Sequence, residues 1–149
     1  MTSNLGSQYI QAQLATMNDG NREQIIDRTK AGVMDMLRKT IRPEFLNRID
    51  DTIMFLPLTR EQIADVVRLQ LNAVRQMLLP QGITLDFTPA AVDYIAAEGF
   101  DPEFGARPVK RAIQRLLLND LSKTILAGSV NREKPIMVDA GSNGLTFEN

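Results

Sequence analysis

The feature that most constrains the fold is an amphipathic stretch at residues 109–127. Its apolar residues recur at three- and four-residue steps, and they are Val109, Ala112, Ile113, Leu116, Leu117, Leu121 and Ile125. This spacing places them on one wide stripe of an α-helix, and Gly128 then provides a typical helix end. A stripe this wide has to be covered by other elements, so the sequence predicts a packed domain around this helix.

Similar periodicities predict further helices, although their boundaries are less sharply marked. They lie at residues 8–17, 22–39, 43–49, 59–78 and 89–95. The turn residues Asn18, Gly20 and Asn21 separate the first two. Thr59 and Gln62 have the spacing of a capping box, and Thr88 before Pro89 is typical of another helix start.

Short apolar or alternating runs predict strands at residues 52–56 and 83–87. A hairpin is expected at residues 135–147, around the sequence Gly-Ser-Asn-Gly. Helices therefore predominate, and a small, mostly antiparallel sheet accompanies them. The sequence predicts the α+β class.

The composition excludes several kinds of chemistry. The 149 residues include neither His nor Cys, so zinc sites of the usual kind, His-based acid–base catalysis and disulfides are absent. A net charge of −1 and 5% aromatic residues give little basis for binding nucleic acid. No apolar run is long enough to cross a membrane. The lack of Cys suits a reducing compartment, and we expect a cytoplasmic location.

Arg107 stands directly before the amphipathic helix, where the helix dipole disfavours a cation. A bound phosphate would turn this arrangement into an anion site, because the free N–H groups and the guanidinium would both contact it. The alternative is that Arg107 pairs with Asp101 or Glu103, or extends into solvent. Its sequence context alone leaves both interpretations open.

Two further polar residues also leave more than one interpretation open. Asn4, in the segment TSN, would place an amide side chain at a strand end. Arg48 follows a short helix and precedes Asp50 and Asp51, so it could simply form a surface ion pair of little energetic value. Taken singly, neither residue identifies a site.

In this order, the segments TSNLGS, RPEFLNRID and FDPEFGARPVKRAI resemble the sensor-1, arginine-finger and sensor-2 elements of Clp-type AAA+ ATPases. Within that class, the chain resembles the second nucleotide-binding domain of the ClpB disaggregase family. The resemblance runs from residue 1 almost to residue 149. It is carried by the order and separation of the three segments.

The resemblance implies a role for each polar residue. Asn4 would orient the water that attacks the terminal phosphate, and Arg48 would reach the nucleotide bound by the neighbouring subunit. Arg107 would contact phosphates bound in its own subunit. Arg42 is the alternative arginine finger, but it precedes Pro43 and fits the motif less well. These are positioning and charge-neutralising tasks, for which a permanently charged guanidinium is suited.

The resemblance also implies an architecture and partners. Residues 1–56 would be a remnant of the large αβα domain, and residues 57–149 would be the small C-terminal lid domain. In the family, the lid packs against the next subunit of a homohexamer that uses ATP with magnesium. Unfolded or aggregated proteins would be the clients, and a DnaK-type chaperone would be a further partner. No nucleic acid and no membrane are expected as partners.

Some family elements are missing from this sequence. It contains neither the phosphate loop GxxxxGK[ST] nor an apolar strand ending in an acid pair before TSN. We therefore expect the chain to correspond to the C-terminal third of an ATPase domain, which by itself neither hydrolyses ATP nor binds it tightly. Gly20 and Gly32 do not lie in an Ile-Gly-Phe-like tripeptide, which favours a disaggregase over an unfoldase that feeds a protease.

Two alternatives to the ATPase interpretation belong to other functional classes. The chain could be a stand-alone interaction module whose apolar faces bind partner helices or strands. It could also bind nucleic acid through Lys110, Arg111 and Arg115, with a steep dependence on salt. The near-zero net charge argues against the second alternative, and these cations are then the solvated face of the helix.

Overall fold

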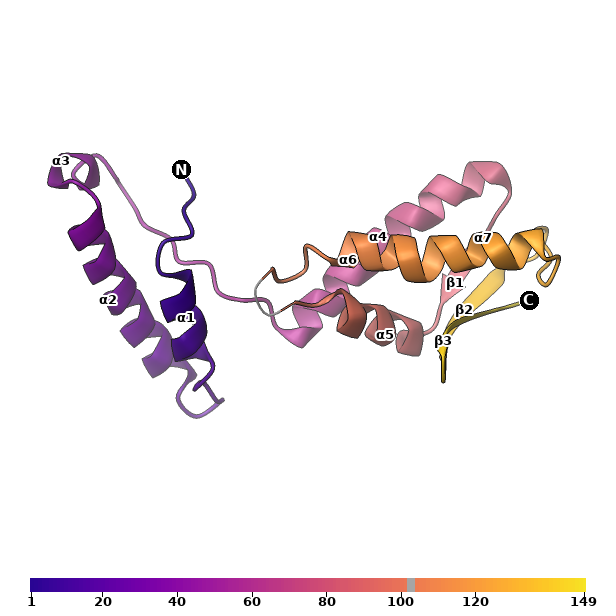
Figure 1. The fold of residues 1–149 in the computed structure, drawn as a ribbon, viewed down its shortest axis with the longest axis horizontal. Coiled ribbons are helices and arrows are strands. Elements are labelled where there is room, and N and C mark those ends of the chain that lie inside the picture. Colours follow the sequence, from indigo (N-terminus) through magenta and orange to yellow (C-terminus); the bar gives the residue numbers. More distant parts are fainter. Residues whose placement is uncertain (102–103) are drawn as a thin grey trace. The chain divides into compact units, whose positions relative to one another are not determined.

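The computed structural model describes residues 1–101 and 104–149, which form two compact units, Met1–Leu56 and Pro57–Asn149. Figure 1 shows the helices and strands of each unit. The interpretation of these units as a large-domain remnant and a lid stays a prediction. Among the described residues, no helix is long and apolar enough to cross a membrane.

The first unit contains the helices α1 (Ser7–Leu14), α2 (Arg22–Thr40) and α3 (Pro43–Leu46). The predicted turn between α1 and α2 is confirmed, because Asn18 Oδ1 accepts hydrogen bonds from the N–H groups of Gly20 and Asn21, both at 3.0 Å. A Cβ on Gly32 would lie 2.3 Å from the Tyr9 hydroxyl oxygen. The absence of a side chain at position 32 thus permits the close packing of α1 on α2.

The predicted strand at residues 52–56 is wrong. These residues have no strand partner, and Ile53 and Phe55 are 72% and 80% exposed. A strand requires a neighbour that satisfies its backbone groups, and all the strands that the described residues form belong to the second unit. An apolar composition favours a strand, but it does not supply the neighbouring strand that pairing requires.

The second unit begins with α4 (Arg60–Leu78), followed by the 3₁₀ turn η1 (Leu79–Gln81). The predicted capping box is confirmed, since Gln62 N–H donates to Thr59 Oγ1 at 3.2 Å and Thr59 N–H donates to Gln62 Oε1 at 2.9 Å. Helix α5 (Pro89–Gly99) starts as expected at Thr88, whose Oγ1 accepts a hydrogen bond from Ala91 N–H at 3.1 Å.

The amphipathic stretch forms one continuous helix whose central part is wound as a π-helix. It consists of α6 (Val109–Ala112), a π-helical turn η2 (Ile113–Leu118) and α7 (Asn119–Leu126). The predicted end is confirmed, because Gly128 adopts a positive φ of 69°. The periodicity predicted a plain α-helix here, so the π-helical winding is a difference from the prediction.

The strands β1 (Leu85–Phe87), β2 (Ile136–Gly141) and β3 (Gly144–Glu148) form a mixed sheet in the order β1-β2-β3. β1 pairs with β2 in parallel, and β2 pairs with β3 in the longer antiparallel ladder. The parallel pair requires a crossover, which α5, α6, η2 and α7 provide (Figure 1). The predicted hairpin and the α+β class are confirmed.

One core fills the second unit between the helices and the inner face of the sheet. Val67, Leu71, Leu85, Ile95, Val109, Leu117, Ile136 and Val138 are almost completely buried there. Alternate residues of β2 point into this core, while Met137 and Asp139 are exposed. The amphipathic helix therefore has the central position that its stripe predicts, and the start of this helix follows directly after Arg107.

Candidate functional site

Arg107 belongs to a compact loop between α5 and α6. Asp101 and Gly105 exchange backbone hydrogen bonds at 3.0 and 2.7 Å, and Asp101 Oδ1 accepts the N–H of Phe104 at 3.0 Å. Gly105 has a φ of 64°, which glycine adopts without the strain that a side chain would cause. Arg107 N–H then donates to the Phe104 carbonyl at 3.3 Å. The backbone that carries Arg107 is thus fixed by its own hydrogen bonds.

The helix start beside Arg107 is fixed by close packing. A Cβ on Gly99, the last residue of α5, would lie 2.9 Å from Val109 Cα. Val109 is the first residue of α6 and is 1% exposed. Gly99 therefore allows the end of α5 to approach the beginning of α6, and this contact determines where the loop that bears Arg107 emerges.

The Arg107 side chain itself is exposed. Among residues 1–101 and 104–149, it forms no ion pair within 4.0 Å, although acids flank the loop. The expected pairing with Asp101 is thus not found in the described structure. Glu103, the other expected partner, lies outside the described residues.

Arg48 lies in the turn that follows α3 and is also exposed. Its N–H donates to the Phe45 carbonyl at 3.1 Å, and Asp51 Oδ1 accepts the N–H of Thr52 at 2.7 Å. Within the described part of the chain, Arg48 makes no ion pair with Asp50 or Asp51. The surface ion pair that the sequence allowed is therefore not present, and the guanidinium faces solvent.

Asn4 lies before α1, is exposed, and accepts the N–H of Ser7 at its carbonyl at 3.1 Å. It lines a mainly apolar cavity of about 440 Å³ within the first unit. Ile49 and Asp51, which flank the Arg48 turn, line the same cavity. The first unit thus brings the chain segments of Asn4 and Arg48 to one cavity, while Arg107 belongs to the second unit.

The residues present fit only part of an ATP site. Two exposed arginines and an amide can contact phosphate oxygens, because guanidinium and amide N–H groups donate to such acceptors. The sequence lacks a phosphate loop. Among the described residues, no group of three or more acidic side chains could hold a metal ion. The described residues thus include hydrogen-bond donors of the kind that phosphate accepts, but no cluster of three or more acidic side chains that could hold a metal ion.

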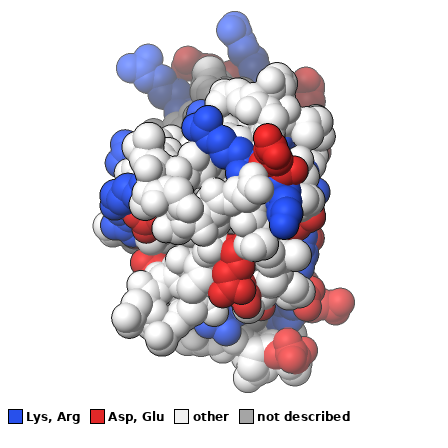
Figure 2. All heavy atoms as spheres, turned by 90° about the vertical axis from the view of Figure 1, so that its right-hand side faces the viewer, with Lys and Arg blue, Asp and Glu red and all other residues white. Residues whose placement is uncertain are grey.

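Charges elsewhere on the surface are mixed in sign. Figure 2 shows one face on which Lys and Arg side chains lie interspersed with Asp and Glu, with uncharged surface between them. Arg115, one of the cations considered for nucleic acid, lies 3.7 Å from a Glu98 carboxylate oxygen. On this face, the charges do not form the continuous basic surface that is typical of nucleic-acid binding.

Two polar arrangements were not foreseen from the sequence. Arg75 of α4 donates through Nε to the Leu85 carbonyl at 2.8 Å and through Nη2 to Asp86 at 2.9 Å, and it lies over the Phe87 ring. Thr88 Oγ1 donates to Asp139 Oδ1 at 2.5 Å. The alternation of residues 83–87 predicted a strand, but no sequence signal specified a partner for Asp86.

The Thr88 and Ala140 contacts have an electrostatic consequence. The hydrogen bond from Thr88, followed by that from the Ala140 N–H, lowers the pKa of Asp139 below its usual value of 3.8. Both donors stabilise the charged carboxylate. This link joins β2 to the start of α5, away from Arg107.

Helices packed on a small mixed sheet, with an exposed arginine between α5 and α6 at a helix start, are the features expected of the small C-terminal domain of an AAA+ protein. A sequence model described as the C-terminal, D2-small domain of ClpB protein matches residues 58–138. The match covers α4, β1, α5, the π-containing helix and the first half of β2, and it ends before β3. The fold expected from the resemblance is confirmed.

Curated relatives match over the whole chain. The chaperone protein ClpB of Bacteroides thetaiotaomicron is 56% identical over 149 residues, which are 100% of this chain and 17% of the relative. ClpB of Porphyromonas gingivalis is 47% identical over 149 residues, with the same shares. The mitochondrial chaperone protein ClpB3 of Oryza sativa subsp. japonica is 43% identical over 142 residues, 95% of this chain and 14% of the relative.

The chain belongs to the ClpB family. It spans about 17% of the length of the first two of these relatives. The resemblance on which the sequence analysis rested is thereby confirmed. The roles of Asn4, Arg48 and Arg107 are not tested by these comparisons and remain predictions.

Proposed function

We propose that this chain is the C-terminal part of the second ATPase domain of a ClpB-type protein disaggregase. The observation that carries the proposal is the 56% identity to the Bacteroides thetaiotaomicron chaperone along the whole chain. The chain supplies the lid and the sensor residues, and the nucleotide's phosphate loop and magnesium ligands belong to another segment. The complete protein uses ATP to unfold aggregated proteins.

The three polar residues, Asn4, Arg48 and Arg107, each have a different role toward the nucleotide. Arg107 contacts phosphate oxygens of its own subunit, and its exposed side chain on a hydrogen-bonded loop supports that role. Arg48, which faces solvent beyond α3, reaches the nucleotide of the neighbouring subunit. Asn4 orients the attacking water. Each group acts by position and charge, which is the usual contribution of a protein to phosphoryl transfer.

The proposed partners follow from the family. The subunits form a homohexamer, the clients are unfolded or aggregated proteins, and a DnaK-type chaperone delivers them. Neither Gly20 nor Gly32 lies in the tripeptide that would attach a protease, so the unfolded client is released. A cytoplasmic location remains a prediction, because relatives with mitochondrial and chloroplastic names also match.

A chimera tests this function. The 149 residues replace the matching segment of the Bacteroides thetaiotaomicron relative, and ATP hydrolysis and the recovery of a heat-aggregated enzyme are measured. We expect both activities. Loss of both in a soluble, assembled chimera would contradict the proposal. The isolated chain should not hydrolyse ATP. ATP turnover above background would contradict the proposal that the phosphate loop and magnesium ligands belong to another segment.

Variants of the chimera test the roles of the residues. Arg48→Ala and Asn4→Ala should each lower ATP hydrolysis by about a hundredfold with nucleotide binding retained. Arg107→Ala should weaken the response of its own subunit to nucleotide. Arg42→Ala is the matched comparison, because Arg42 is the alternative arginine finger and lies close to Arg48 in the sequence. Equal losses in the Arg42 and Arg48 variants would refute the arginine-finger assignment.

A further inference from the structure

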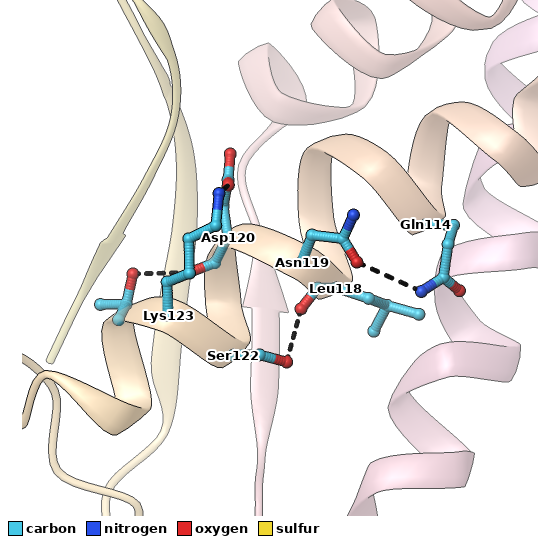
Figure 3. A network of polar contacts seen from close by, with 7 residues as sticks. Gln114, Leu118, Asn119, Asp120, Ser122 and Lys123 are labelled. Carbon is cyan, nitrogen blue, oxygen red and sulfur yellow. Dashed lines mark hydrogen bonds and ion pairs between the residues drawn. The ribbon is translucent and has the colours of Figure 1, made fainter.

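The Arg107 guanidinium is not held by side-chain partners in the described part of the chain. Polar side chains further along the same helix do find partners within the helix (Figure 3). Lys123 Nζ lies 2.9 Å from Asp120 Oδ1. Ser122 Oγ donates to the Leu118 carbonyl at 2.7 Å. The direction in which the Arg107 side chain extends therefore depends on the backbone that carries it.

That backbone is connected to Asp101 by successive hydrogen bonds. The Asp101 carboxylate accepts the N–H of Phe104, and the Phe104 carbonyl accepts the N–H of Arg107. Asp101 and Gly105 also exchange two backbone hydrogen bonds, which we call the Asp101–Gly105 bridge. A change at either end of this bridge alters the backbone that bears Arg107. Asp101 thus acts on Arg107 through the backbone and not through an ion pair.

Gly105 is the position in this loop that depends most on residue type. Its φ of 64° lies in the left-handed region, which a Cβ disfavours and which asparagine tolerates better than most residues. Apart from the chain neighbours of Gly105, no atom of the described residues lies within 4 Å of the place that a Cβ would take. Glycine is therefore required there by the backbone conformation and not by a lack of space.

We propose that Asp101 and Gly105 are positioning residues for Arg107, and that the bridge between them sets the direction in which the guanidinium meets the phosphates of the nucleotide. A guanidinium binds phosphate through a planar set of N–H groups, so both its place and its orientation matter. A displacement of about 1 Å can lower a rate by about a hundredfold. The inference rests on the proposed function, because that function assigns Arg107 to phosphate.

Glycine variants of the chimera separate positioning from a general structural role. Gly105→Ala places an unfavourable φ beside Arg107. Gly82→Ala is the matched control, because Gly82 follows η1 in the same unit and has a φ of 76° with equally open surroundings. We expect the melting temperatures of the two variants to agree within about 4 °C, since both lose the same backbone freedom. Only Gly105→Ala should raise the KM for ATP, by about fivefold or more.

A double variant tests whether Gly105 acts through Arg107. Arg107→Ala alone should raise the KM for ATP, and adding Gly105→Ala should raise it no further, because no guanidinium is left to position. A further increase of about threefold or more in the double variant would overturn the proposal. Gly105→Asn should have a lower KM than Gly105→Ala, since asparagine adopts a positive φ more readily.

A second pair of variants tests the other end of the bridge. Asp101→Ala should raise the KM for ATP, whereas Asp101→Asn should restore it, because the amide oxygen still accepts the N–H of Phe104. This pair decides the question by itself if Gly105→Ala does not assemble. Equal KM values for Asp101→Ala and Asp101→Asn, or for Gly105→Ala and Gly82→Ala, would overturn the positioning role and leave the proposed function intact. Absence of activity in the unmodified chimera would instead refute the proposed function.

Discussion

At the scale of single residues, Thr59 shows how a local motif determines where an element begins. Its reciprocal hydrogen bonds with Gln62 satisfy N–H groups that α4 would otherwise leave without a partner. We expect Thr59→Ala to lower the free energy of unfolding of the second unit by about 1 kcal/mol. Urea denaturation measures this change, and Thr59→Ser, which keeps the hydroxyl, is the control. Equal stability of the Ala and Ser variants would contradict the role of the cap.

Asp139 makes the stability of the folded chain depend on pH. Because its pKa is lowered in the folded chain, its contribution to stability is present above the ordinary value of 3.8 and is lost as the pH falls through the lowered value. Asp139→Asn keeps an acceptor for the Thr88 hydroxyl but cannot titrate. Melting temperatures from pH 6 downward should therefore fall less steeply in the variant below about pH 4. Parallel curves would contradict this assignment.

Single residues also show the limit of sequence reasoning. Thr59 and Thr88 were identified as caps because a cap depends on neighbours only three residues away. Arg107 was identified by its place before a helix. Its surroundings could not be predicted, since Gly99 and Val109 meet only after folding. Arg75 was missed for the same reason, because Asp86 lies eleven residues further along the chain.

At the scale of elements, residues 52–56 show that an apolar composition alone does not produce a strand. Within the described structure, the N–H groups of residues 53–56 and 58 donate no backbone hydrogen bond, whereas β2 is paired on both sides. We expect the amides of residues 53–56 and 58 to exchange at close to the unfolded rate and those of β2 to be protected. Hydrogen exchange of the 149-residue chain measures both. Strong protection of the segment would show that it pairs with a second copy.

A double variant, compared with the parent chain, decides between these outcomes. Ile53→Lys and Phe55→Lys together replace the two most exposed apolar side chains of the segment, and charged residues oppose edge-to-edge pairing. Exchange should be unchanged if the segment is unpaired in solution. Slower exchange in the parent chain than in the lysine variant would identify association through this segment.

Elements also show why the winding of the long helix escaped the sequence analysis. The stripe at residues 109–125 was assigned to an α-helix because three- and four-residue steps were read together. Steps of three and of four residues both occur in this stripe, as in an ordinary α-helix, so the sequence contains no clear signal of the π-turn. The hairpin was easier to predict, because its turn and alternation are local.

At the scale of the whole molecule, the distribution of buried residues predicts that the two units differ in stability. Among the described residues of Met1–Leu56, only Ile25 and Thr29 are buried, whereas Pro57–Asn149 contains the continuous core. Burial of apolar surface is the main source of folding free energy, so we expect the first unit to unfold at a lower urea concentration.

Residues 57–149 produced alone test this difference, because their core needs no residue of the first unit. Their urea midpoint should equal that of the second unit in the 149-residue chain, followed through amide resonances of β2. The amides of α2 in the longer chain should report an earlier transition. A single transition shared by α2 and β2, together with a lower midpoint for residues 57–149, would mean that the units stabilise each other. Independent transitions would mean that the second unit folds on its own core, so that variants of the Arg107 loop and the π-turn can be measured without the first unit.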